Sequence, residues 1–150
     1  MRELNTEIEI NSSPERVWEL LTDFKQYPRW NPFIRSVRGK LEPEAKLEVR
    51  IQPSGARGMT FRPAVLKAER TRELRWLGRL LIPGIFDGEH IFTIEPIAEN
   101  SVRFVQREQF SGLLVPLLWR SLNRDTRRGF VEMNAALKKR AESAEDVRFS

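Results

Sequence analysis

The sequence contains no cysteine and only one histidine, and these shortages exclude several kinds of chemistry. Without cysteine the chain forms no disulfide bond, carries no thiolate nucleophile and builds no cysteine-ligated zinc site. A metal site made of several histidines is equally excluded, and the acidic residues do not cluster at the spacings of metal ligands. We therefore expect neither a metal nor another cofactor.

The motifs of nucleotide-binding proteins and serine hydrolases are also missing. The chain has no Gly-x-Gly-x-x-Gly or Gly-x-x-x-x-Gly-Lys loop, and none of its serines lies in a Gly-x-Ser-x-Gly frame. No apolar run approaches the ~20 residues that cross a membrane. Because the opening MRELNTEIEI alternates polar and apolar side chains, it is typical of a strand rather than a signal peptide. We expect a cytoplasmic protein.

The composition is that of one globular domain with a basic charge. A chain of 150 residues suffices for one domain with its own core. The formal net charge is +5, and residues 116–141 alone hold seven basic and two acidic residues, which equals this excess. A solvated helix face explains such a charge run, and attraction to anionic lipid or nucleic acid is the alternative. Since no nucleic-acid-binding motif accompanies the charge, we expect no nucleic-acid partner.

The stretch from Pro116 to Ala141 has the apolar period of one long helix. Steps of three and four residues separate the members of its apolar face, Trp119, Leu122, Thr126, Phe130, Met133 and Leu137. Such a helix is roughly 39 Å long. Burial of its five large apolar side chains contributes ~7–15 kcal/mol before entropy is subtracted. The pattern therefore predicts a helix that packs along a sheet.

Most of the chain before this helix alternates in the manner of β-strands. We expect strands at 4–10, 34–40, 47–52, 59–70, 74–76, 88–96 and 102–110. Pro63 interrupts the fourth of them, which indicates an edge position or a bulge. A short helix near residues 14–21 follows the first strand, and residues 23–32 form either a turn or a broken helix. This order predicts an α+β fold with one antiparallel sheet covered on one face.

Three polar residues fall on strand faces that otherwise carry phenylalanine, namely His90, Gln106 and Glu108. If these faces turn inward, the polar groups either bond one another or face a wet cavity, because an unsatisfied buried polar atom costs ~1–3 kcal/mol. For His90 a core residue, a ligand contact and a catalytic base all remain open. For Glu108 the alternative to a role in a binding site is a structural ion pair with an arginine such as Arg62 or Arg103.

The element order and several segments resemble the START/Bet v 1-like (SRPBCC) helix-grip superfamily, near its polyketide cyclase/dehydrase and lipid-transport branch. The matching segments are IEINSSPERVW (8–18), WNPF (30–33), LRW (74–76), GEHIF (88–92), REQFSG (107–112) and MNAALK (133–138). The resemblance implies a seven-stranded curved antiparallel sheet wrapped around the long C-terminal helix, with two short helices after the first strand. It implies a single ligand-binding domain over residues 1–142, followed by a frayed tail at 143–150.

The resemblance also implies an apolar cavity between sheet and helix that holds a hydrophobic small molecule, such as a lipid, a polyketide or a similar aromatic. The residues expected to line it are Trp76, His90, Phe92, Phe104, Gln106, Glu108, Trp119, Leu122, Asn123, Thr126 and Phe130. The apolar segments 80–86 and 113–115 are candidates for a lid. We expect a binding or transport protein rather than an enzyme, acting as a monomer or homodimer with transient contact to membrane surfaces.

An enzyme of the cyclase or dehydratase type is the alternative function. Cyclases of this superfamily use polar cavity residues to position and protonate a polyketide chain. The counterparts that the resemblance implies here are His90, Gln106, Glu108, Asn123 and Arg62. These residues match no defined catalytic set. A further alternative is that aromatic side chains fill the interior and leave no cavity.

Overall fold

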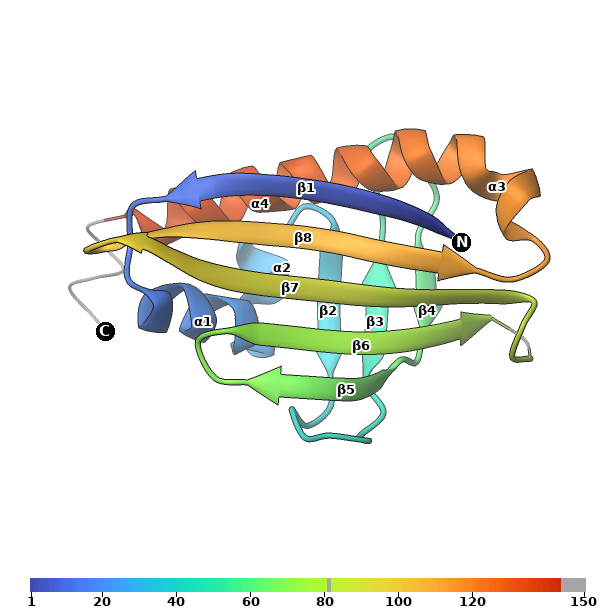
Figure 1. Cartoon of the computed structure of the whole chain (residues 1–150), viewed down its shortest axis with the longest axis horizontal. Helices are drawn as coiled ribbons and strands as arrows, with labels where there is room; N and C mark the ends of the chain where they lie inside the picture. Colours follow the sequence, from blue (N-terminus) through green and yellow to red (C-terminus); the bar gives the residue numbers. More distant parts are fainter. Residues whose placement is uncertain (81, 144–150) are drawn as a thin grey trace.

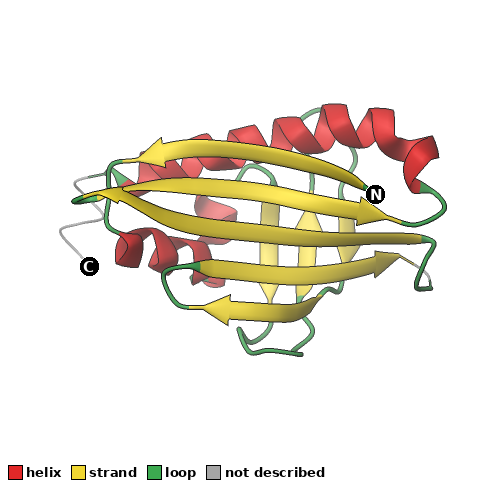
Figure 2. Ribbon diagram, viewed as in Figure 1, coloured by secondary structure: helices red, strands yellow, loops and turns green. Residues whose placement is uncertain are grey.

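Two antiparallel sheets and the C-terminal helix enclose the hydrophobic core in the computed structural model, which describes residues 1–80 and 82–143 (Figures 1 and 2). The strands are β1 (Arg2–Ile10), β2 (Ile34–Arg38), β3 (Glu48–Ile51), β4 (Met59–Phe61), β5 (Ala64–Glu69), β6 (Glu73–Leu80), β7 (Phe86–Ala98) and β8 (Ser101–Ser111). The helical elements are α1 (Pro14–Thr22), η1 (Phe24–Gln26), α2 (Tyr27–Trp30), α3 (Val115–Ser121), η2 (Leu122–Thr126) and α4 (Arg127–Ala141).

The larger sheet has the order β1-β8-β7-β6-β5, and the smaller one has the order β2-β3-β4. The long strands of the first sheet run along the molecule, and the short strands of the second lie behind them in a crossing direction (Figure 1). β1 shows how the sequence specifies a face, because Leu4 and Ile10 are buried while Glu3, Glu7 and Glu9 alternate with them on the exposed side.

The expected single sheet of seven strands is wrong in detail, since eight strands form two sheets. The expected strand at 59–70 divides at Pro63, so that β4 joins the small sheet and β5 joins the large one. Proline has no N–H for a strand ladder, and the chain changes sheets at this residue. An isolated bridge joins Lys46, which precedes β3, to Ala64 of β5 on that side.

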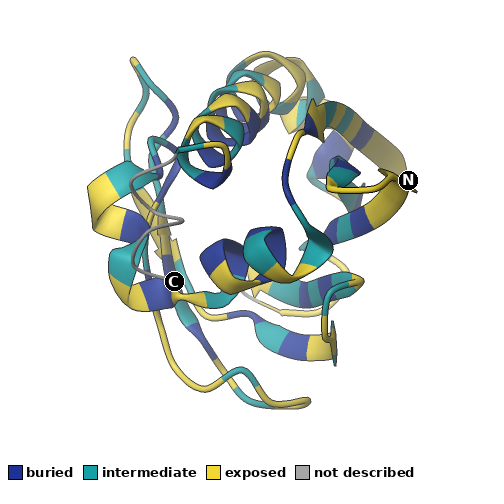
Figure 3. Ribbon diagram, turned by 90° about the vertical axis from the view of Figure 1, so that its left-hand side faces the viewer, coloured by how far each residue is buried: buried dark blue, intermediate teal, exposed yellow. Residues whose placement is uncertain are grey.

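The C-terminal helix confirms the predicted apolar face. α3, η2 and α4 follow one another without a break, and Phe130, Met133 and Leu137 are completely buried. Seen along the molecule, the helix turns its buried residues toward the interior (Figure 3). Gly129 permits this close approach, because a β-carbon there would overlap the ring of Phe33.

The two short helical segments predicted after the first strand are present as α1 and as the η1–α2 pair. Val17, Trp18, Leu20 and Leu21 bury the apolar side of α1, as its sequence pattern indicates. Within the described ranges no helix is long and apolar enough to cross a membrane. Residues 144–150 of the expected frayed tail lie outside the described residues.

Candidate functional site

An apolar pocket of about 240 Å³ opens between the two sheets and the middle of the C-terminal helix. One wall comes from β3, β4 and the loop between them, and six of its residues are Ile51, Pro53, Ala56, Arg57, Met59 and Phe61. Residues of β6, β7 and β8 form the opposite wall, and Leu122, Asp125 and Thr126 of η2 close the side. Such a concave, mostly apolar space is typical of a small-molecule site.

His90 and Glu108 bring polar atoms to the inner wall of this pocket. They lie directly opposite each other on β7 and β8, with His90 Nδ1 3.7 Å from Glu108 Oε1. The side chain of His90 is 5% exposed and that of Glu108 15% exposed, so the pocket is their main opening. The strand period therefore predicts their inward direction correctly, and the register of the sheet makes them neighbours.

A chain of hydrogen bonds runs from His90 into the core, away from the pocket. His90 Nε2 lies 2.9 Å from Gln106 Oε1, and Gln106 Nε2 donates to Asn134 Oδ1 at 2.8 Å. Asn134 Nδ2 donates to Thr6 Oγ1 at 2.9 Å, and Thr6 Oγ1 donates to the backbone oxygen of Gln106 at 2.9 Å. The chain thus joins β7, β8, α4 and β1, and it satisfies polar groups that burial would otherwise penalise.

Burial shifts the ionisation of both residues away from their charged forms. It raises the pKa of the Glu108 carboxyl from 4.5 to about 8. It lowers the pKa of the His90 imidazole from 6.5 to about 3, and the hydrogen bond with Gln106 opposes this fall only in part. At pH 7 the carboxyl group therefore holds its proton beside a neutral imidazole.

Aromatic rings surround the imidazole on the side away from the pocket. His90 stacks on Phe92 with ring centroids 4.3 Å apart, and the ring of Phe130 lies 5.0 Å from it. Trp76 approaches edge-on at 5.5 Å. These apolar neighbours exclude water, which is why a charge on His90 is so strongly disfavoured.

The residues expected to line the cavity fall into three groups. Those that line the pocket are His90, Glu108, Leu122 and Thr126. Those that are fully buried in the core around it are Trp76, Phe92, Phe104, Gln106 and Phe130. Trp119 packs against Phe110 with its ring beneath Arg2, and Asn123 is exposed and accepts hydrogen bonds from Arg127. Asn123 points outward because the helix presents it on the solvated face.

The expected ion pair of Glu108 with an arginine is wrong. Arg62 lies 3.5 Å from Glu48, and Arg103 pairs with Glu7 and Glu95 on the outer face of the sheet. Arg62 is exposed in the link between β4 and β5, and Arg103 lies on the outer face of β8, so neither reaches the interior. The partner of Glu108 is instead His90.

A family model described as polyketide cyclase / dehydrase and lipid transport matches residues 1–142. The chain belongs to this family. No curated protein matches it. Among solved structures, a START superfamily protein from Mycobacterium smegmatis is 20% identical with a TM-score of 0.73, and the match covers 93% of this chain and 97% of that one.

Two enzymes share the fold of this family member at lower identity. The Zhui aromatase/cyclase from Streptomyces sp. R1128 is 15% identical with a TM-score of 0.73, over 94% of this chain and 93% of that one. A point mutant of norcoclaurine synthase from Thalictrum flavum, in complex with a transition-state analogue, is 10% identical with a TM-score of 0.71, over 93% of each chain. These matches confirm the predicted helix-grip resemblance.

Sequence reasoning missed the pocket wall that the β3–β4 loop supplies in this member of the polyketide cyclase / dehydrase and lipid transport family. Side-chain contacts fasten the loop to the helix, since Ser54 Oγ donates to Glu132 at 2.9 Å and Arg128 Nη2 donates to the backbone oxygen of Ser54 at 2.6 Å. No sequence pattern marks these partners, because 74 or more residues separate them along the chain.

Sequence reasoning also missed the π-helical turn η2 in the middle of the C-terminal helix. Three of its five residues, Leu122, Asp125 and Thr126, line the pocket. A π-turn widens the helix locally, and such turns are frequent at functional sites. The apolar period of the sequence continues through η2 without interruption, so it does not indicate the π-turn.

Proposed function

We propose that this domain binds a compact hydrophobic molecule in the pocket, with an oxygen of the ligand directed at Glu108. The observation that carries the proposal is an apolar pocket whose inner wall holds two neighbouring, uncharged polar groups. Apolar surface supplies the affinity in such sites, and a few placed polar groups orient the ligand. Membership of a family described by polyketide cyclases and lipid transport supports this class of ligand.

The size of the pocket favours a small ligand within that class. Its volume of about 240 Å³ lies below the ~300–1,000 Å³ typical of sites for drug-sized molecules. An aromatic molecule of one or two rings suits this space better than a long acyl chain or a complete polyketide. The rings of Phe33, Phe61, Phe86 and Phe110 supply apolar walls for it.

An acid–base enzyme is the second candidate, and one observation favours it. Glu108 is a carboxylic acid with a pKa near physiological pH, which is the property of an efficient general acid. Its neighbour His90 is neutral, so the pair offers a proton donor and an acceptor within 3.7 Å of each other. Turnover of an enolisable aromatic ketone that Glu108→Gln abolishes would distinguish this candidate from simple binding.

Exposed apolar residues near one end of the molecule support a further part of the proposal, contact with anionic membrane surfaces. We define the apolar rim as Leu80, Ile82, Leu113, Leu117 and Leu118, of which Leu117 is 80% exposed. The two predicted lid segments meet there, because the N–H groups of Leu113 and Leu114 donate to Gly84 and Ile85. Leu81 of the first segment lies outside the described residues.

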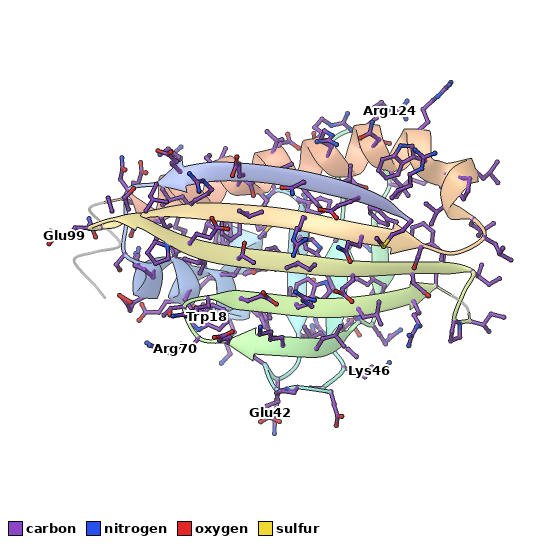
Figure 4. All side chains as sticks on the ribbon, viewed as in Figure 1. Trp18, Glu42, Lys46, Arg70, Glu99 and Arg124 are labelled. Atoms are coloured by element: carbon purple, nitrogen blue, oxygen red, sulfur yellow. The ribbon has the colours of Figure 1, made fainter. Side chains whose placement is uncertain are left out.

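Basic residues beside the apolar rim complement a negatively charged lipid surface. Arg79 precedes Leu80 in β6, and Arg120 follows the exposed leucines of α3. Arg124, one helical turn further on, extends outward from the molecule (Figure 4). Apolar side chains with adjacent cations are the combination that inserts shallowly into anionic bilayers. Since Leu80 also lines the pocket, this surface adjoins the route by which a ligand reaches the interior.

Calorimetric titration with a panel of one- and two-ring aromatic ketones, phenols and fatty acids tests the binding proposal. Thr126→Trp and Leu122→Trp place a large ring in the pocket and are expected to abolish binding. Val131→Trp adds the same ring on the exposed face of α4 and is the matched control. Failure of the whole panel to bind, or binding that both pocket variants retain, would refute the proposal.

A further inference from the structure

The buried hydrogen-bond chain determines which nitrogen of His90 carries the hydrogen. Thr6 uses its hydroxyl hydrogen on the backbone oxygen of Gln106, so its oxygen accepts from Asn134 Nδ2. The oxygen of the Asn134 amide therefore faces Gln106 Nε2, and the oxygen of the Gln106 amide faces His90 Nε2. Because an amide oxygen can only accept, Nε2 of the neutral imidazole must be the N–H donor.

The other ring nitrogen is then an acceptor directed at Glu108. A neutral imidazole has one N–H, so Nδ1 carries a lone pair and lies 3.7 Å from Glu108 Oε1. An ionised carboxylate at this place would set two acceptors against each other without a hydrogen between them. A protonated carboxyl group instead supplies a donor, and the geometry therefore accommodates one proton on the Glu108–His90 pair.

No cation at the inner wall offsets a negative charge on this pair. Among the described residues, His90 is the one basic group within salt-bridge distance of Glu108. Arg57, Arg79 and Asp125 also line the pocket, but the two arginines are exposed. Arg79 pairs with Asp87 at 3.7 Å, and Asp125 pairs with Arg124 and Arg128. An anionic group that reached the inner wall would thus lose its hydration without gaining a cation.

We propose that the Glu108–His90 pair makes the pocket selective for neutral ligands with an accepting oxygen, above all aromatic ketones, over carboxylates of the same shape. The inference rests on the proposed binding function and adds the class of ligand. The carboxyl group donates to the ketone oxygen, and His90 Nδ1 is free to accept from a neighbouring hydroxyl of the ligand. A carboxylate directed at this pair brings a charge that the inner wall of the pocket cannot neutralise.

Matched ligands test this selectivity directly. We expect 2-acetylnaphthalene to bind at least about tenfold more tightly than 2-naphthoate at pH 6, the equivalent of one hydrogen bond of ~1.4 kcal/mol. As Glu108 loses its proton above pH 8, the affinity for 2-acetylnaphthalene is expected to fall by about tenfold in all, which is the loss of that one hydrogen bond. Glu108→Gln keeps a neutral donor and removes this pH dependence, whereas Glu95→Gln on the outer part of β7 leaves it unchanged.

The outcomes separate this inference from the proposed function. Equal affinity for the two naphthalenes, or tighter binding of the carboxylate, overturns the selectivity while the binding function stands. Failure of every neutral and anionic aromatic to bind overturns the binding function and the inference together. A ketone affinity that does not change between pH 6 and pH 10 overturns the role of the Glu108 proton, because ionisation of Glu108 would then leave the site unaffected.

The protonation state can also be measured without any ligand. Because His90 is the only histidine in the sequence, ¹⁵N-histidine labelling of the untagged protein reports one imidazole ring. At pH 7 we expect a neutral ring with hydrogen on Nε2 and none on Nδ1, and a change in the Nδ1 resonance as Glu108 titrates. A ring protonated on Nδ1, or charged at pH 7, contradicts the assigned geometry.

Discussion

Gly88 and Glu108 lie on neighbouring strands so close together that a β-carbon at position 88 would collide with Glu108 Oε2. The absent side chain of Gly88 therefore creates the space that the carboxyl group occupies in the pocket wall. The ring of Phe110 bounds the same space, 3.7 Å from the position of such a β-carbon. The backbone of Gly88 has an ordinary strand conformation, so the space above it is the reason for glycine here.

Replacement of Gly88 by alanine is expected to displace the Glu108 carboxyl group. Because the colliding atom is the end of a flexible side chain, the cost in the free energy of unfolding should lie near the lower end of the ~1–3 kcal/mol typical of overpacking. Chemical denaturation in a double-mutant cycle measures the effect. Gly88→Ala should cost less in a Glu108→Ala background, where the colliding atoms are gone, and equal costs in both backgrounds would show that the two residues do not interact.

The two buried titratable groups are expected to produce a stability plateau between pH 4.5 and 6.5. Burial raises the pKa of Glu108 to about 8, so its contribution falls as pH rises from 4.5 to 8. Burial lowers the pKa of His90 to about 3, so its contribution falls as pH drops from 6.5 to 3. Between pH 4.5 and 6.5 the two effects cancel. Stability should fall by ~1.4 kcal/mol per pH unit as pH rises from 6.5 to 8, and by the same amount as pH drops from 4.5 to 3.

Urea unfolding at a series of pH values checks this profile, with Glu108→Gln as the decisive variant. Without the carboxyl group, stability should rise from pH 3 to 6.5 and stay constant above it, since of the two buried groups only His90 remains. Glu95→Gln should keep the profile of the unmodified protein. An unmodified protein whose stability stays level from pH 6.5 to 8 would contradict the assignment to Glu108.

Replacement of Asn134 by leucine should destabilise the protein, because it leaves Gln106 Nε2 without its acceptor and Thr6 Oγ1 without its donor. An unsatisfied buried polar group costs ~1–3 kcal/mol. The control is Asn123→Leu on the exposed side of the helix, which should change the free energy of unfolding by less than ~0.5 kcal/mol. Asn134→Leu should also free the amide of Gln106 to flip, and ¹⁵N spectra of His90 should then show a second tautomer.

Whether Gly129→Ala stabilises or destabilises the folded protein tests the contact between α4 and Phe33. On an exposed helix face this change stabilises by ~0.5–1 kcal/mol, because alanine favours the helix. Here the new methyl group would overlap the ring of Phe33, so we expect destabilisation of ~1–3 kcal/mol. Thermal unfolding distinguishes the two signs, and relief of the effect by Phe33→Leu would confirm its origin.

Substitution of aspartate for Leu117 or Ile82 should abolish contact with anionic lipid. Vesicle co-sedimentation at ~0.15 M salt measures this contact, and higher salt should weaken it through screening. Val131→Asp, which changes an exposed apolar residue of α4 away from the apolar rim, is the matched control. Equal sedimentation of all variants, or no sedimentation of the unmodified protein, would exclude the membrane contact.

Local periodicity in the sequence was sufficient to predict the helix, most strands and the α+β class. The alternation of β7 and β8 also predicted that His90, Gln106 and Glu108 turn inward, because the side of a strand on which a residue lies follows from its position alone. The position of Pro63 indicated an edge position or a bulge. That the chain instead changes sheets there became clear only from the partners of β4 and β5.

The tertiary structure alone decided which of these inward residues share a pocket. Strand register placed His90 opposite Glu108, and the β3–β4 loop, held by Ser54 and Arg128, supplied a wall that no period in the sequence indicates. The same packing put Trp76 and Phe92 in the core and left space over Gly88. The physical reason is that periodicity depends on neighbours a few residues away, whereas register, cavities and buried hydrogen bonds depend on contacts between segments distant in the chain.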